Sequence, residues 1–148
     1  MSARIRPYEP ADEQGTLAVW FAAGKATYTF LPTWTTITRA QAESVFRGIT
    51  SRCELMVAEV DGGIVGFLAM DGSYVDRLYV HPDNQRQGWG KRLLDAARQQ
   101  WPAGLELHTH QQNHGARSFY EANGFTAVRF GISPAPESAP DVEYHWRP

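Results

Sequence analysis

The chain has 148 residues, enough for a single domain over residues 1–148 and too few for two ordinary domains. With 43% hydrophobic and 20% charged residues, its composition excludes a disordered or fibrous chain. The net charge of −2 argues against nucleic acid as a main partner, because proteins that bind phosphate backbones carry an excess of Lys and Arg.

The N-terminal third of the sequence predicts a pair of helices. A short strand at residues 3–6 precedes a helix over residues 11–23, where apolar residues recur at helical spacing. The aromatic segment 28–34 contains a proline and is expected to be a loop, after which residues 38–48 form a second helix.

The middle of the sequence predicts an antiparallel meander. Three apolar, β-prone runs occupy residues 56–60, 64–70 and 75–80. Asp61-Gly62-Gly63 and Asp71-Gly72-Ser73 separate them, and Asp-Gly supplies the positive φ that a tight hairpin turn requires.

After this meander, strands and helices alternate. Pro82 ends the third strand, and apolar residues take helical spacing from about Gly88 to Trp101. Residues 105–109 alternate as a strand, and a helix over residues 114–123 follows and ends at a glycine.

The C-terminal segments predict a strand pair joined by a loop. Residues 141–146 alternate between apolar and polar side chains, as a half-buried strand does, and we expect them to pair with residues 125–130. The Pro- and Ser-rich segment 133–140 between them is expected to be a loop.

The cysteine content and the apolar stretches bear on the compartment. Cys53 is the sole cysteine, so no intramolecular disulfide forms, and we expect a small, partly buried thiol there. The first residues lack the apolar run of a secretory signal, and no stretch approaches the roughly 18 apolar residues of a membrane-spanning helix. We therefore expect a cytoplasmic protein with no membrane partner.

The loop 85–91 carries the strongest chemical signal, because Gly88 and Gly90 stand at the start of a helix. A helix N-terminus offers free N–H groups and the positive end of the helix dipole, so this turn predicts a phosphate or pyrophosphate site. A Walker A loop is excluded since Arg92 stands where a metal-binding hydroxyl belongs. A dinucleotide fingerprint is excluded since Leu93 replaces its third glycine.

The pattern Gln85-x-x-Gly88-x-Gly90 resembles the pyrophosphate loop of the GNAT superfamily, the acetyl-CoA-dependent N-acetyltransferases. A second segment, from Asn113 to Phe125, resembles the family's N-x-x-A-x-x-F-Y-x-x-x-G-F helix. The resemblance extends from about residue 55 to the C-terminus. It implies an α/β (α+β) fold with a mixed, mostly antiparallel sheet of six or seven strands, splayed at its centre and flanked by helices.

The resemblance also implies how acetyl-CoA binds, as acyl donor and without a metal. The diphosphate would lie over the amides of residues 86–91, and the pantetheine arm would run between the strand ending at Val80 and strand 105–109. The N–H of Val80 would polarise the thioester carbonyl. The cofactor-binding residues so implied are Leu78, Val80, Gln85, Arg86, Gln87, Gly88, Trp89, Gly90, Lys91, Asn113 and Tyr120.

Two side chains are candidates for proton transfer. Tyr120 matches the family position that meets the sulfur of coenzyme A, and a phenol with a pKa of about 10 stays protonated at neutral pH, so it can act as general acid. The alternative for Tyr120 is a core aromatic. Asp76 is a candidate for the base that deprotonates the amine, and its alternative is a solvated carboxylate or an ion-pair partner of Arg77.

The acceptor site is expected around three aromatic residues, Tyr28, Trp34 and Tyr74. Tyr28 and Trp34 lie in a loop that, in the resembled family, forms part of the acceptor pocket. Aromatic side chains there suggest a substrate with an apolar or cationic part. The alternative is a hydrophobic plug made by Tyr28, Phe30 and Trp34. His108, His110 and His114 lack a defined metal-ligand spacing, so no metal is expected.

The function predicted from these residues is transfer of an acetyl group to a primary amine by direct attack in a ternary complex. A small molecule or a peptide is open as the acceptor, and a monomer or a homodimer as the assembly. A non-catalytic module that binds or senses coenzyme A is the alternative function.

Overall fold

A seven-stranded sheet forms the centre of the computed structural model, which describes residues 2–148. Its strands are β1 (Ala3–Pro7), β2 (Glu54–Val60), β3 (Gly63–Asp71), β4 (Tyr74–Val80), β5 (Leu105–His110), β6 (Thr126–Ile132) and β7 (Pro140–Trp146). They lie in the order β1-β2-β3-β4-β5-β7-β6, and β4–β5 is the parallel pair in an otherwise antiparallel sheet. The predicted sheet type and strand number are confirmed.

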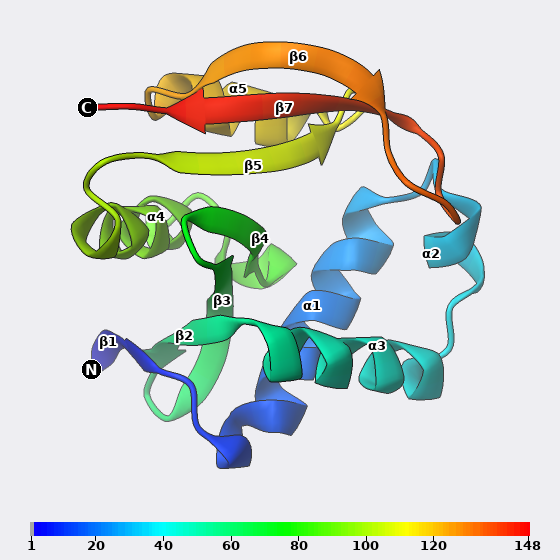
Figure 1. The fold of residues 1–148 in the computed structure, drawn as a ribbon. Helices are drawn as coiled ribbons and strands as arrows, with labels where there is room; N and C mark the ends of the chain where they lie inside the picture. The colour runs from blue at the N-terminus through cyan, green and yellow to red at the C-terminus, as the bar shows by residue number, and fades with distance from the viewer. Residues whose placement is uncertain (1) are drawn as a thin grey trace.

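Helices cover both faces of this sheet. They are α1 (Glu13–Thr27), α2 (Pro32–Thr36), α3 (Arg39–Arg52), α4 (Trp89–Gln100) and α5 (His114–Ala122), with 3-10 turns η1 (Pro10–Asp12) and η2 (Pro82–Asn84). Figure 1 shows α1 and α3 on one side of the sheet and α4 on the other. One buried cluster joins α4 and α5 to the sheet, and a second joins α1, α2 and α3 to it. Within residues 2–148, no helix has the length and apolar character needed to span a membrane.

The sheet opens between β4 and β5. These strands share one paired position, Tyr74 with Glu106, near the start of each strand. The N–H of Glu106 donates to the carbonyl of Ser73 at 3.2 Å, and beyond this point the strands diverge. The predicted splay is therefore confirmed, and it leaves backbone groups of β4 unpaired toward its C-terminal end.

The turns that join β2, β3 and β4 have the predicted geometry. Asp61 and Gly62 take φ values of 49° and 84°, and Gly72 takes 57°. Positive φ at these positions matches the twist of the flanking strands, which explains why Asp-Gly occurs at both turns. The expected meander is confirmed, with β-bulges near Ala58 and Ala69.

The aromatic segment 28–34 differs from its prediction as a loop, because α2 begins at Pro32. Proline fits the first position of a helix, where its missing N–H has no partner in any case. The short helix turns the indole of Trp34 into the core, where 7% of the residue is exposed. Trp34 contacts Trp20 edge to face, with 5.0 Å between ring centroids.

Gly24 in α1 lies directly against the ring of Trp34. A Cβ built on Gly24 would stand 2.2 Å from two ring carbons of Trp34, far inside van der Waals contact. Gly48 in α3 offers a contrast, because a Cβ there meets no atom within 4 Å. Glycine is thus required for packing at one helix position and not at the other.

We expect Gly24→Ala to lower the free energy of unfolding by about 2 to 3 kcal/mol, because the new methyl group displaces the indole. Gly48→Ala should instead raise it by about 0.4–1 kcal/mol, through lower entropy of the unfolded chain and better helix propensity. Urea denaturation of both variants measures the difference. Equal effects of the two substitutions would contradict the contact between Gly24 and Trp34.

Candidate active site

The loop between β4 and α4 folds as its glycines require. Gly88 is the N-cap of α4 at φ 89°, a left-handed conformation that favours glycine, and it offers no capping side chain. Arg86 also has a positive φ, 63°. The N–H groups of residues 89–91 therefore have no carbonyl partner within the helix. Gly90 has a different role, since its missing Cβ allows the ring of Phe119 to approach, with a built Cβ only 3.2 Å away.

The end of β4 faces the gap in the sheet with free backbone groups. The N–H of His81 donates to the carbonyl of Val65 on β3 at 2.8 Å. Because successive residues of a strand point their N–H groups to opposite edges, the N–H of Val80 points toward the gap. The side chain of Gln85 donates to the carbonyl of Val80 at 3.1 Å. Gln85 thus connects the loop to the strand end.

A cleft of about 680 Å³, here called the strand-gap cleft, runs from this opening to the start of α4. Most of the predicted cofactor residues line it: Leu78, Val80, Gln85, Arg86, Gly88, Trp89, Gly90, Lys91, Asn113 and Tyr120. Gln87 is not among the lining residues. Segments from the two motifs, about 30 positions apart in the chain, thus meet on one cleft.

Three of these lining residues differ in whether their polar groups already have partners within the protein. The side-chain oxygen of Asn113 accepts from the N–H of Ala116 at 3.1 Å and caps α5, which leaves its NH₂ group free. Lys91 pairs with Asp95 at 2.7 Å on the exposed side of α4. Arg86 forms no ion pair with any described residue. Arg86 is thus the cation most available to a bound anion.

Tyr120 is both a core aromatic and a cleft residue. It is 8% exposed, and its ring lies 5.2 Å from the Phe119 ring and 5.4 Å from the Phe125 ring, centroid to centroid. Burial raises the pKa of its phenol above the ordinary value. The hydroxyl is therefore protonated at neutral pH, the state that a proton donor requires.

A second cavity, of about 840 Å³, lies beside the strand-gap cleft and is here called the loop-side cavity because the β6–β7 loop closes it. Its lining includes the three predicted acceptor residues, Tyr28, Trp34 and Tyr74, but not Phe30. Tyr28 also lines the cleft, and its hydroxyl lies 2.7 Å from that of Tyr79. The two spaces thus share a wall.

Asp76 lies at this shared wall, and two arginines contact its carboxylate. Both of its oxygens accept from Arg52, at 3.1 and 3.0 Å, and Arg77 contacts one of them at 3.2 Å. Both carboxylate oxygens are thus occupied by two guanidinium groups. This geometry favours the ion-pair alternative for Asp76 over the role of a base.

The β6–β7 loop brings a residue to the site that the sequence did not single out. Nε2 of His110, at the end of β5, lies 3.2 Å from an oxygen of Glu137 in this loop. In the sequence, His110 is considered only together with His108 and His114, whose spacing predicts no metal site. Nothing in a Pro- and Ser-rich segment indicates which of its residues will face a strand that lies about 27 positions away.

The other histidines have separate partners. His108 faces Glu143 at 3.7 Å, and His81 accepts from the N–H of Asp83 at 3.1 Å in a plain turn. Among residues 2–148, no group of three His, Cys, Asp or Glu side chains is arranged to hold a metal ion. Cys53 is half-buried at the end of α3, and burial raises its thiol pKa.

Comparison with known proteins agrees with this geometry. A family model for the acetyltransferase (GNAT) domain matches residues 51–127. The peptidyl-lysine N-acetyltransferase YjaB of Salmonella typhimurium is 32% identical over 126 residues, which cover 84% of each chain. The solution structure of apo YjaB from Escherichia coli matches with a TM-score of 0.82 and 25% identity, over 99% of this chain and 98% of that one. PaiA N-acetyltransferase of Thermoplasma acidophilum, in complex with coenzyme A, matches with a TM-score of 0.73 and 22% identity over 100% of both chains.

These similarities first define the class of protein, an acyltransferase enzyme that acts as an N-acetyltransferase. The chain belongs to the GNAT acetyltransferase family, because the family model spans more than half of it and the Salmonella relative matches most of its length. The family resemblance noted from the two sequence motifs is confirmed.

Proposed function

We propose that this enzyme transfers the acetyl group of acetyl-CoA to the ammonium side chain of a lysine in a peptide or protein. The observation that carries the proposal is the open gap between β4 and β5, which leads to the uncapped N-terminus of α4. The relative named peptidyl-lysine N-acetyltransferase supports the acceptor class, and the neighbour in complex with coenzyme A supports the donor. In this proposal residues 1–148 act as one domain.

The donor fits the strand-gap cleft in two parts. Its diphosphate accepts from the free N–H groups at residues 89–91, with Arg86 supplying positive charge. Its pantetheine amides bond to the unpaired backbone of β4, at Leu78 and Val80, as a short added strand would. The NH₂ group of Asn113 is free to bond to the same arm.

In this proposal the acetyl group passes directly from the thioester to the amine. The acceptor ammonium loses a proton, and its nitrogen attacks the thioester carbon while the carbonyl electron pair moves onto oxygen, where the N–H of Val80 donates. Collapse of this intermediate breaks the carbon–sulfur bond. Tyr120 donates its proton to the departing thiolate. The nitrogen loses two protons in all: the one lost before attack passes to solvent, and the one lost as the amide forms restores the phenol.

The test is release of free thiol from acetyl-CoA in the presence of a lysine peptide, the same peptide with lysine replaced by norleucine, and a panel of small amines. We expect thiol release with the lysine peptide and acetylated product by mass spectrometry. Acetyl-CoA at 100 times its Kd should also stabilise the fold by about 2.7 kcal/mol in thermal denaturation. Stabilisation without thiol release for any amine would instead support a module that binds coenzyme A without turnover.

A further inference from the structure

Four carboxylates line the loop-side cavity: Asp76, Glu137, Asp141 and Glu143. Arginines neutralise two of them, since Arg52 and Arg77 pair with Asp76 and Arg129 pairs with Glu143 at 3.2 Å. For Glu137 and Asp141, no Arg or Lys nitrogen of the described residues lies within the ion-pairing distance of 4.0 Å. The cavity thus holds two carboxylates that form no ion pair with an Arg or Lys of the described residues.

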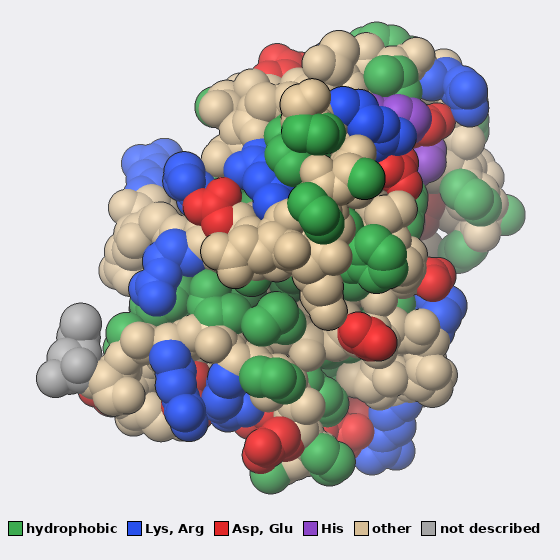
Figure 2. Space-filling model, turned by 60° about the vertical axis from the view of Figure 1, so that its left-hand side comes forward, with side chains coloured by type: hydrophobic (Ala, Val, Ile, Leu, Met, Phe, Trp, Pro, Cys, Tyr) green, Lys and Arg blue, Asp and Glu red, His purple; other side chains and the backbone are tan. Residues whose placement is uncertain are grey.

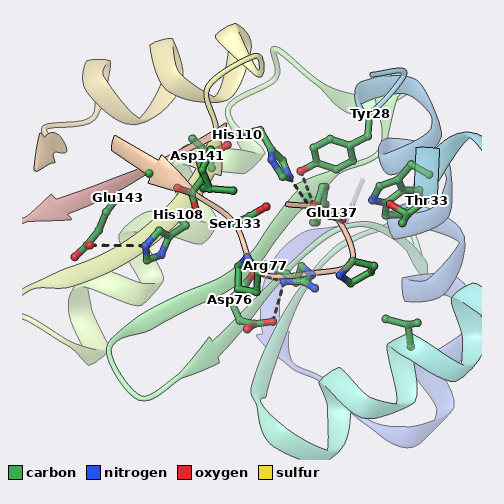
Figure 3. Close-up of a pocket in the computed structure, with 18 of the residues that line it drawn as sticks. Tyr28, Thr33, Asp76, Arg77, His108, His110, Ser133, Glu137, Asp141 and Glu143 are labelled. Carbon is green, nitrogen blue, oxygen red and sulfur yellow. Dashed lines mark hydrogen bonds and ion pairs between the residues drawn. The ribbon is translucent and has the colours of Figure 1, made fainter. Parts of the chain in front are cut away.

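Glu137 is the better placed of these two carboxylates. Its carboxylate lies 3.2 Å from Nε2 of His110, and 29% of its side chain is exposed. Figure 3 shows His110 and Glu137 pointing toward one another across the cavity wall, with Tyr28 beside them. The hydrogen bond from His110 lowers the pKa of Glu137, so this carboxylate is charged at neutral pH. The contact with His110 fixes the position of this carboxylate at the cavity wall.

The wall around Glu137 contains further polar atoms without partners. Trp20 Nε1, Thr33 Oγ1 and His110 Nδ1 are buried and make no hydrogen bond, and all three residues line this cavity. They are three of the five such side-chain atoms in the described chain. Buried polar groups are normally paired, so their concentration here indicates a wall that a bound polar group or water completes.

The surroundings also provide the apolar surface that an aliphatic amine needs. The rings of Tyr28 and Trp34 lie tilted together with 5.6 Å between centroids, and Tyr28 meets His110 edge to face at 5.5 Å. Asp141 pairs across the strands with His110 and adds a second negative charge on the same side. The arginines that line the cavity are Arg77, which pairs with Asp76, and Arg129, which pairs with Glu143.

From this arrangement we infer that Glu137 is the residue that recognises the positive charge of the acceptor, so that the acceptor class is an alkylammonium whose stem lies along Tyr28 and Trp34. The inference rests on the proposed function and deepens it. Glu137 is a specificity residue here, and His110 is a positioning residue that holds its carboxylate. Aniline-type amines and other acceptors that are uncharged at neutral pH would lack this interaction.

Binding of two matched probes to the chain saturated with coenzyme A tests the inference. The probes are Nα-acetyl-lysine methylamide and the norleucine analogue, which has nearly the same stem but no charge, and calorimetry gives both affinities. In the wild type we expect the lysine probe to bind at least about tenfold more tightly. Glu137→Gln should reduce this preference to below about threefold, because it removes the charge and keeps the shape.

Glu54→Gln is the control, because this substitution removes the same charge from the chain. Glu54 is an exposed carboxylate outside the loop-side cavity. It should keep the full preference. An unchanged preference in Glu137→Gln, or equal binding of the two probes to the wild type, would overturn the inference. If Glu137→Gln does not fold, the salt dependence of wild-type binding replaces it as the test. The preference of the wild type for the lysine probe should then weaken with rising salt, and a preference independent of salt would overturn the inference.

The readouts separate this inference from the proposed function. Probe selectivity is measured without turnover, whereas acetyl transfer is measured by thiol release. Selective binding of the lysine probe without thiol release would count against the transfer reaction alone. Thiol release with equal binding of the two probes would count against the role of Glu137 alone.

Discussion

Tyr120→Phe is expected to lower kcat about 100-fold while leaving the Kd for coenzyme A nearly unchanged, because loss of a positioned proton donor typically costs 10²–10⁴-fold. The ring of Tyr120 packs between Phe119 and Phe125, and phenylalanine keeps those contacts. Tyr120 lines the strand-gap cleft, and burial keeps the pKa of its phenol above the ordinary value. Stopped-flow or steady-state thiol release gives kcat, and calorimetry gives the Kd.

Tyr8→Phe is the matched control, since it removes one hydroxyl from a half-buried tyrosine on the far side of the sheet. It should leave both kcat and Kd unchanged. Full activity of Tyr120→Phe would show that the thiolate departs without this donor, and Tyr120 would then be a core aromatic alone. A large rise in the Kd with unchanged kcat would assign the hydroxyl to donor binding.

The parts of the fold that sequence predicted are those with a local physical cause. Apolar, β-prone runs predicted β2, β3 and β4, and Asp-Gly predicted the turns between them because positive φ is required there. The start of α4 followed from Gly88 in the same way. The splay between β4 and β5 came from the family resemblance, since no property of either strand alone determines where parallel pairing stops.

The parts that sequence missed depend on contacts between distant segments. A proline at residue 32 reads as a loop breaker, yet it begins α2, because burial of Trp34 against Gly24 outweighs the local signal. The sequence predicts Asp76 as a candidate base or an ion-pair partner of Arg77, and only the fold reveals that Arg52, from the end of α3, also reaches it. Glu137 could not be singled out for the same reason, since it lies in the β6–β7 loop and its partner His110 lies at the end of β5.

The net charge of the chain does not show how its charged residues are distributed. On the face drawn in Figure 2, Lys and Arg side chains are interspersed with Asp and Glu side chains, with hydrophobic side chains visible between them. A net charge near zero therefore conceals local structure, since the loop-side cavity gathers carboxylates while Arg86 and Lys91 lie at the strand-gap cleft. Charge counts alone do not separate a site for an anionic donor from a site for a cationic acceptor.

Gly88→Val is expected to weaken coenzyme A binding by roughly 50-fold, because it disturbs the donor groups that the proposed site depends on most. Gly88 has φ 89°, where a β-branched residue is strained by about 1–2 kcal/mol. The chain relieves this strain by leaving the left-handed conformation, which turns the first N–H groups of α4 away from the diphosphate. Loss of one or two charge-assisted hydrogen bonds, at about 1.5–3 kcal/mol each, gives an effect of this size.

The matched control is Gly72→Val, in the turn between β3 and β4. Gly72 also has a positive φ, 57°, and at both glycines a Cβ meets no atom within 4 Å, so each substitution introduces backbone strain without a clash. Both variants should therefore lose similar stability in thermal denaturation, whereas only Gly88→Val should lose coenzyme A affinity in calorimetry. Equal affinity of the two variants would mean that the diphosphate is not held by the start of α4, because the strain is shared and the position relative to the strand-gap cleft is what differs.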